Sequence, residues 1–239
     1  DPKTGQFWVL KATPRLGRTS AFAAKALGYP IAKVAALLAI GYRLDEIEHP
    51  FEAGATALVE PAFDYLAAKL PRWPFDRISG ADRKLGAEMK STGEVLMLER
   101  SVEAALLKGI RALDMRIDHL YQAKIAALSD EELTAGLIYP TDEEIFYLAE
   151  ALRRGYTVED LSHLSKIDAF FIEKINHIIQ LERQLVDKKA DLTVLAAAKR
   201  YGFSDRKISE LWQITPAQLL ALRQEAHIEE GFQEVNAIA

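Results

Sequence analysis

The chain has 239 residues, of which 49% are hydrophobic and 27% charged, a composition typical of globular proteins with a sizeable core. Its net charge of -5 gives no general attraction to nucleic acid or anionic membranes, and the absence of cysteine excludes disulfides, thiolate catalysis and cysteine metal sites. The five histidines lie far apart, so no zinc site is predicted. The longest apolar stretch, residues 30–42, is shorter than the roughly 20 residues that a membrane span needs. We expect a cytoplasmic protein that binds neither nucleic acid nor membranes.

The first predicted element is a short strand, Phe7–Leu10, which follows an N-terminal turn. Polar side chains come directly after it, namely Lys11, Thr13, Arg15 and Arg18. A strand that delivers polar residues to the start of a helix is a common way to build an active site. Because Arg15 and Arg18 are three positions apart, both can face one spot and hold a phosphate or a carboxylate through forked hydrogen bonds. The alternative interpretation is two exposed arginines in a loop.

Two helices are predicted after the arginines. Thr19 or Ser20 is suited to cap the first, over residues 20–28, and Gly28 is suited to end it. Pro30 opens the second, because proline is favoured at the first position of a helix.

Two strands are predicted further along the chain. The first covers Phe63–Leu70 and is expected to end at Pro71, because proline has no N–H to donate to a strand ladder. The second covers Glu94–Leu98, and Ser101 is suited to cap the helix that follows. After about residue 113 no strand is predicted. The sequence therefore indicates a mostly helical α+β chain, divided into a mixed part, residues 1–113, and an all-helical part, residues 114–239.

The helical part contains an internal repeat, residues 149–175 and 196–222, related by a shift of about 47 positions. Each copy has a helix ended by glycine, then an aromatic residue, a Thr or Ser cap, a second helix, and Asp168 or Thr215 as the cap of a third. The aligned pairs are Gly155 and Gly202, Tyr156 and Phe203, Thr157 and Ser204, Leu161 and Ile208, Leu164 and Leu211, and Ile167 and Ile214.

Two motifs invite functional interpretations that their residues do not favour. "GAEMKST" (86–92) resembles a phosphate-binding loop, but Met89 stands where that loop needs a glycine before the lysine. "YGFSDRKISELWQITPAQLLALR" (201–223) has the rhythm of a DNA-binding helix-turn-helix. Its charges are mixed, and Leu211, Trp212 and Ile214 are apolar where a recognition helix shows amides and arginines. Packing between helical units explains the second motif better.

Three stretches resemble successive parts of the large subunit of carbamoyl-phosphate synthetase, in the same order. They are "TPRLGRTSAFAAKALGYPIAKVAALLAIGYRLDEI", "FDYLAAKLPRWPFDRISGADRKLGAEMKSTGEV" and "FYLAEALRRGYTVEDLSHLSKIDAFFIEKI". The resemblance covers nearly the whole chain, and "KSTGEV", "PRWPF" and "GYPIAKVAA" are its most specific segments. It implies that residues 1 to about 113 form the C-terminal portion of the first ATP-grasp domain, which makes carboxyphosphate. Residues from about 114 on then form the all-helical oligomerisation domain, and the chain is a fragment.

The resemblance also implies a parent activity. That activity is ATP-dependent formation of carbamoyl phosphate from bicarbonate and ammonia, with ATP and Mg or Mn as cofactors and with products that feed arginine and pyrimidine synthesis. The implied partners are the remainder of the large subunit, a glutaminase small subunit and further copies of the chain. The fragment itself needs no cofactor and is expected to act mainly as a scaffold.

The metal-binding strand of the family departs from its pattern in this sequence. In the family it delivers Glu-x-Asn-Pro-Arg, whose Glu and Asn bind the metals that bridge the ATP phosphates. Lys11 and Thr13 occupy those positions here, and an ammonium group cannot ligate Mg²⁺. The resemblance carries over Arg15 as a catalytic residue and Arg18 as a phosphate contact, with no metal ligand.

The changed metal positions leave a second hypothesis open, a diverged, non-catalytic regulatory relative. Asn236 and Ile238, where the family is expected to have Asp and Cys, point the same way. A helix-turn-helix DNA-binding protein is the third hypothesis, and it rests on the repeat alone.

Overall fold

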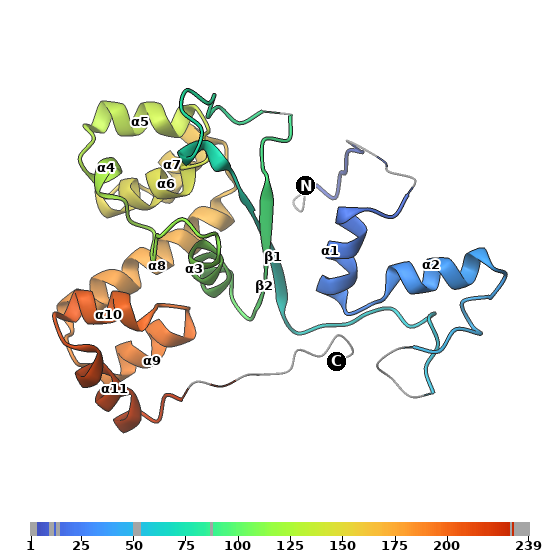
Figure 1. Cartoon of the computed structure of the whole chain (residues 1–239). Coiled ribbons are helices and arrows are strands. Elements are labelled where there is room, and N and C mark those ends of the chain that lie inside the picture. The colour runs from blue at the N-terminus through green and yellow to red at the C-terminus, as the bar shows by residue number, and fades with distance from the viewer. Residues whose placement is uncertain are drawn as a thin grey trace. The chain divides into compact units, whose positions relative to one another are not determined.

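The computed structural model describes residues 4–9, 12, 15–49, 54–86, 88–229 and 231 (Figure 1). They fall into two compact units, residues up to 64 and residues from 65 on. Each unit has its own hydrophobic core.

The described residues of the first unit form two helices, α1 (Arg18–Leu27) and α2 (Ile31–Ala39). α1 begins earlier than predicted, with Gly17 at the cap position, so the prediction of Thr19 or Ser20 as the cap is wrong. The hydroxyl of Ser20, in the first turn, accepts a hydrogen bond from the Gly17 N–H at 3.4 Å and so satisfies a backbone N–H at the start of the helix. Gly28 adopts the left-handed conformation that ends α1, with a φ of 64°, as predicted.

A small core stabilises this unit. Val34, Ile47 and Ala57 are buried in it, and the hydroxyl of Tyr29 donates a hydrogen bond to the Ala57 carbonyl at 2.8 Å. Residues 7–9 of the predicted strand Phe7–Leu10 lie outside any strand and are exposed, while Leu10 lies outside the described residues. The prediction is wrong for residues 7–9, because no described segment pairs with them.

The second unit begins with an antiparallel pair, β1 (Leu66–Arg72) and β2 (Gly93–Glu99), whose register runs from Leu66 opposite Glu99 to Arg72 opposite Gly93. Pro71 lies inside β1, opposite Glu94, so the prediction that the strand ends there is wrong. In a two-stranded sheet both strands are edges, and an edge strand tolerates a residue without an N–H. A short 3₁₀ helix, η1 (Pro74–Asp76), follows β1.

Helix α3 (Val102–Ala112) packs on both strands. Ser101 caps it as predicted, since its hydroxyl accepts a hydrogen bond from the Ala104 N–H at 3.2 Å. A Cβ at Gly109 would lie 2.8 Å from Leu70, which shows how closely α3 approaches β1.

Eight helices follow within the described residues, and no strand does. They are α4 (Ala123–Ala126), α5 (Asp130–Ile138), α6 (Glu144–Arg153), α7 (Val158–Ser165), α8 (Ala169–Asp187), α9 (Leu192–Arg200), α10 (Asp205–Trp212) and α11 (Pro216–Glu225). The longest, α8, contacts α3, α6, α7, α9 and α10 and runs between the two ends of the helical part (Figure 1). The prediction of a mostly helical α+β chain is confirmed.

The two stretches of the internal repeat have the same backbone conformation at equivalent positions. Gly155 and Gly202 have φ values of 95° and 90°. The hydroxyls of Thr157 and Ser204 each accept a hydrogen bond from the backbone N–H three residues later. Lys166 and Gln213 then end α7 and α10 in the left-handed conformation, with φ values of 62° and 57°. Both stretches therefore have the same order of helices, turns and capping residues.

The predicted division near residue 113 falls within the second unit. Compact units and sequence domains are different divisions of a chain, so this boundary stays a prediction. Helix α3, which ends at Ala112, packs on the sheet and also contacts α8.

Candidate functional site

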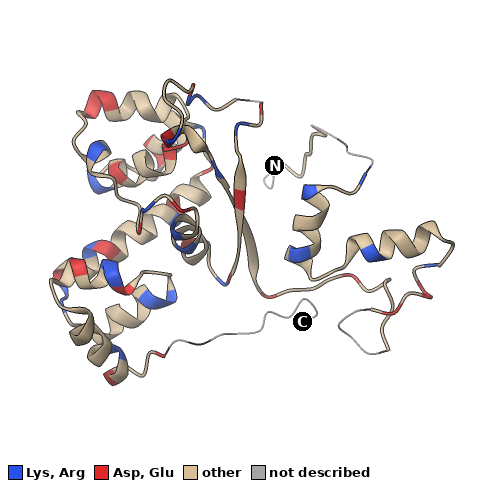
Figure 2. Cartoon of the chain, in the orientation of Figure 1, with Lys and Arg blue, Asp and Glu red and all other residues tan. Residues whose placement is uncertain are grey.

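The residues singled out from the sequence lie at the start of α1. Arg15 and Arg18 are both exposed, Arg18 as the first residue of the helix. Lys11 and Thr13 lie outside the described residues. The surroundings are basic, because the sequence has no Asp or Glu between Asp1 and Asp45, and Figure 2 shows α1 and α2 without acidic residues.

This donor set does not fit a divalent metal ion, which prefers carboxylate and amide oxygens. The described part of the chain contains no group of three or more His, Asp or Glu side chains that could hold a metal. Two exposed arginines can hold an anion, but the described residues include no group beside them that would take part in a reaction. No catalytic step through a metal follows from these residues.

A mainly apolar hollow of about 340 Å³ lies in the second unit, between β1, α3, α6 and α8. Trp73, Ile145 and Phe171 are among the residues that line it. Two acidic residues, Asp142 and Glu144, also line the hollow. Glu144 is the first residue of α6, and its Oε1 is buried without a hydrogen-bond partner among the described residues. Burial raises the pKa of Glu144 above its ordinary value of 4.5. The hollow therefore combines apolar walls with one buried carboxylate oxygen that lacks a donor.

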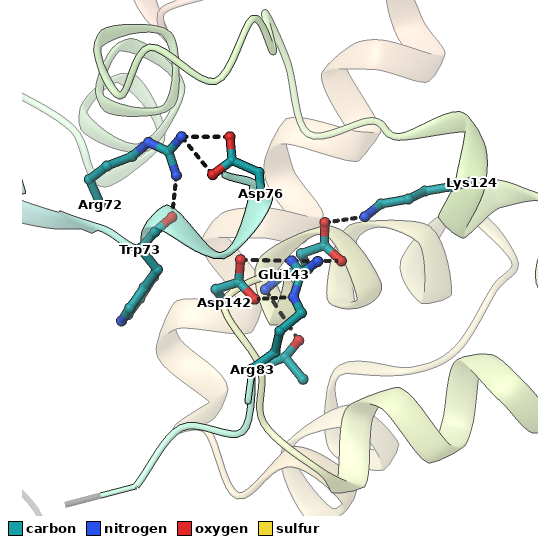
Figure 3. A network of polar contacts seen from close by, with 8 residues as sticks. Arg72, Trp73, Asp76, Arg83, Lys124, Asp142 and Glu143 are labelled. Carbon is teal, nitrogen blue, oxygen red and sulfur yellow. Dashed lines mark hydrogen bonds and ion pairs between the residues drawn. The ribbon is translucent and has the colours of Figure 1, made fainter. Parts of the chain in front are cut away.

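A network of ion pairs lies beside the hollow and joins the β1–β2 connection to α4 and α6 (Figure 3). The Arg83 guanidinium donates from Nε and Nη2 to the two carboxylate oxygens of Asp142, at 2.8 and 2.7 Å, and lies 3.1 Å from Glu143. Lys124 also binds Glu143. The hydrogen bonds to Asp142 raise the pKa of Arg83. Every charge in this network has a partner, so the network holds a loop in place and leaves no free charge for a ligand.

Arg72 makes a separate set of hydrogen bonds at the end of β1 and in η1. It donates to both carboxylate oxygens of Asp76, at 2.9 and 2.8 Å, and also to the Trp73 carbonyl (Figure 3). The hydrogen bond from Arg72 lowers the pKa of Asp76. These bonds fix the turn that leads from β1 to Trp73, and Trp73 is one wall of the apolar hollow.

The sequence matches two family models. Residues 94–227 match the oligomerisation domain of the carbamoyl-phosphate synthetase large chain, and residues 1–47 match the ATP-binding domain of the carbamoyl-phosphate synthase L chain. The first match covers more than half of the chain. This chain belongs to the carbamoyl-phosphate synthetase large-chain family.

The match to the oligomerisation domain of carbamoyl-phosphate synthetase begins in β2 and runs to just beyond α11. It covers both stretches of the repeat and Glu144, but only part of the hollow, because β1 and Trp73 precede it. The match to the ATP-binding domain covers Arg15 and Arg18, the predicted site residues. Their roles stay predictions.

Helix α10 of this synthetase domain places its apolar residues inward. Ile208 and Trp212 are buried, and the indole N–H of Trp212 donates to the Leu185 carbonyl at 2.7 Å. Basic and acidic residues are interspersed over α9, α10 and α11 (Figure 2), and Asp205 pairs with both Lys199 and Arg223. This arrangement supports the interpretation of the repeat as packed helical units.

The sequence did not single out an exposed aromatic pair on the oligomerisation domain's long helix. Phe170 and Phe171 open α8, and their side chains are 47% and 52% exposed. Large apolar residues at the start of a helix more often pack in the core than lie at the surface. Only the placement of α8 shows that these two rings lie at the surface.

Within the described residues no single helix is both long and apolar enough to cross a membrane. α1 and α2 meet that criterion only when taken together, and they are bent by 113° relative to each other.

Proposed function

We propose that the chain is the oligomerisation and scaffolding segment of a carbamoyl-phosphate synthetase large subunit and associates with further copies of itself. The match of residues 94–227 to the oligomerisation domain carries this proposal. The exposed apolar side chains of α8 support it, because contiguous exposed apolar surface marks contact sites between proteins.

The parent enzyme would be an ATP-grasp ligase that converts bicarbonate, ATP and ammonia from glutamine to carbamoyl phosphate for arginine and pyrimidine synthesis. Its cofactors would be ATP with Mg or Mn, and its location the cytoplasm. The partners of this chain would be the remainder of the large subunit and the glutaminase small subunit. The matches to two domains of the synthetase large chain support this assignment.

We expect the chain alone to be inactive. Lys11 and Thr13 stand at the positions of the family's metal ligands, and the ammonium group of a lysine repels a divalent cation. Arg15 would contact the reacting groups and Arg18 a phosphate only within the complete ATP site.

Two measurements on the purified chain test the proposal. Sedimentation velocity over a range of concentrations is expected to show reversible self-association, and an ATPase assay is expected to show no bicarbonate-dependent hydrolysis. A chain that sediments as a monomer at every concentration would contradict the oligomerisation role. Bicarbonate-dependent ATPase activity would contradict the scaffolding role.

A diverged, non-catalytic regulatory relative is the second candidate, and Lys11 and Thr13 favour it. The full-length parent discriminates between the two candidates. Carbamoyl phosphate formation by that parent would exclude the regulatory candidate. An inactive parent that gains ATP-dependent carboxyphosphate formation on Lys11→Glu and Thr13→Asn would support it.

A further inference from the structure

One face of α8 combines two exposed aromatic rings with a cation. The rings of Phe170 and Phe171 lie edge to face, with centroids 5.3 Å apart and an interplanar angle of 82°. One turn later, the ammonium group of Lys174 lies 5.3 Å from the centroid of the Phe170 ring. Its carboxylate neighbour, Glu103, is 3.9 Å away, at the outer limit of an ion pair.

The internal repeat shows that the fold does not require aromatic residues there. A shift of 47 positions places Phe170 on Ala217 and Phe171 on Gln218, at the start of α11. Gln218 serves its own helix there, because its side chain accepts a hydrogen bond from the Thr215 N–H at 2.9 Å. The buried positions are apolar in both copies, since Ile172 corresponds to Leu219. The two phenylalanines are therefore additions to the surface of the first copy alone.

The apolar hollow of about 340 Å³ begins beside these rings. Phe171 lines it, so the protruding Phe170 ring lies directly next to a concave apolar surface. Glu144 also lines the hollow, and its buried Oε1 has no hydrogen-bond donor among the described residues. A buried carboxylate oxygen without a donor destabilises the chain, and a matching donor would offset that loss.

We propose that this face is the contact between two copies of the chain, in which Phe170 of each copy enters the hollow of the other and Lys174 approaches Glu144. The inference rests on the proposed oligomerisation and names its surface and symmetry. A two-fold contact uses the same patch on both subunits, so the patch must be complementary to itself. A partly exposed ring beside a hollow satisfies that requirement, and so do a cation and a carboxyl group with one unpartnered oxygen.

The surface has the character of the centre of a protein interface. Aromatic side chains that fill apolar pockets contribute most of the binding energy at such centres. A standard interface buries about 800 Å² on each partner, and a two-fold contact uses every residue of the patch twice. Substitution of one residue therefore removes two contacts from the dimer.

Sedimentation velocity of the full chain tests the inference with a matched pair of variants. Phe170→Glu is expected to weaken self-association at least tenfold, because it places a carboxylate in an apolar hollow beside Glu144. Leu220→Glu, at a residue of α11 that is 51% exposed, is expected to leave self-association unchanged. Circular dichroism of both variants establishes that they are folded.

Cross-linking gives a second readout that uses the absence of cysteine from the chain. A chain with Phe170→Cys and a second chain with Ile145→Cys, in the wall of the hollow, are expected to form a mixed disulfide on oxidation. The matched pair Leu220→Cys and Ile145→Cys is expected to form none.

The outcomes separate this inference from the proposed function. If the unmodified chain self-associates while Phe170→Glu is as strongly associated as Leu220→Glu, the surface assignment is wrong and the oligomerisation role stands. If the unmodified chain is monomeric, both are overturned. If Phe170→Cys links only to a second Phe170→Cys chain, the rings meet each other at the axis and the insertion into the hollow is wrong.

Discussion

His119 and Glu182 are 63 positions apart in the sequence, and their Nε2 and Oε2 atoms lie 3.0 Å apart inside the second unit. Arg153 binds the same carboxylate through Nε and Nη2, at 3.0 and 2.8 Å. The three side chains connect the segment after α3 to α6 and α8. Hydrogen bonds from His119 and Arg153, with the charge of Arg153, outweigh the burial of Glu182 and lower its pKa from 4.5 to about 2.

This contact predicts a loss of stability in acid. Burial lowers the pKa of His119 below its ordinary 6.5, so the folded state resists a proton that the unfolded chain accepts. Both groups have a lower pKa in the folded state than in the unfolded chain. Their contribution to folding stability is therefore complete above about pH 6.5 and decreases as the pH falls towards 2. Glu182 contributes about 3 kcal/mol to the free energy of unfolding at neutral pH. This contribution is lost progressively as the pH falls from about 4.5 to about 2.

Urea unfolding at pH 7.5, 5.5 and 3.5, followed by circular dichroism, measures this loss. Glu182→Gln is expected to reduce the change in the free energy of unfolding between pH 5.5 and 3.5, and to lower that free energy at pH 7.5. An unchanged acid profile in that variant would exclude Glu182 as its source.

Gly202 and Gly155 are expected to differ in their tolerance of alanine. Both have a positive φ, so either substitution costs about 1 kcal/mol in backbone strain. A Cβ at Gly202 would also lie 2.8 Å from the Ala104 Cα, whereas a Cβ at Gly155 would meet open space. Gly202→Ala should therefore lose about 1–3 kcal/mol more than Gly155→Ala in the free energy of unfolding. Equal losses would mean that α3 and the turn after α9 can separate freely.

The ion pairs of Arg83 and Arg77 are expected to contribute unequally to folding stability. Arg83→Ala leaves Asp142, whose side chain is only 6% exposed, without its forked donor and should cost about 1–3 kcal/mol. Arg77 pairs with Asp114 at the surface, so Arg77→Ala should change stability by less than about 0.5 kcal/mol. Urea unfolding of the two variants measures the difference, and a similar loss in both would contradict it.

Trp212→Phe removes one hydrogen bond and keeps most of the apolar volume. The Leu185 carbonyl would lose the 2.7 Å bond from the indole inside the core, a loss of about 1–3 kcal/mol. Thermal unfolding followed by circular dichroism should show a lower Tm. Trp73→Phe, at the half-buried wall of the hollow, is the control and should lower the Tm less.

Arg15→Ala and Arg18→Ala are expected to leave the stability and the self-association of the chain unchanged. Both side chains are exposed, and surface substitutions usually change stability by less than about 0.5 kcal/mol. Thermal unfolding and sedimentation of the double variant check this. A marked loss of stability would show that the two arginines hold the first unit together.

The elements that the sequence predicted well are those encoded by local signals. The caps Thr157 and Ser204 and the glycines before them lie within a few residues of the helices that they start or end, so their pattern predicts the turns. The prediction for Pro71 was wrong because tolerance of proline depends on how many strands pair with its own.

The candidate surfaces could not be predicted from the sequence, because they depend on distant contacts. Arg83 and Asp142 are 59 positions apart, and nothing near either residue indicates the other. Phe170 lies two positions before the buried Ile172 and so on another face of α8, but the sequence does not show which residues from other elements that face meets. The hollow likewise forms from β1, α3, α6 and α8 together.

The length of α8 connects the aromatic pair with the second copy of the repeat. Its 19 residues span about 28 Å, with Phe170 in the first turn and Leu185 in the last. The carbonyl of Leu185 holds Trp212 of α10, so the helix is attached to the second copy of the repeat at its far end. A helix of this length behaves as a stiff rod in a packed core. A partner that binds the aromatic end of α8 and tilts the helix would therefore also displace α10.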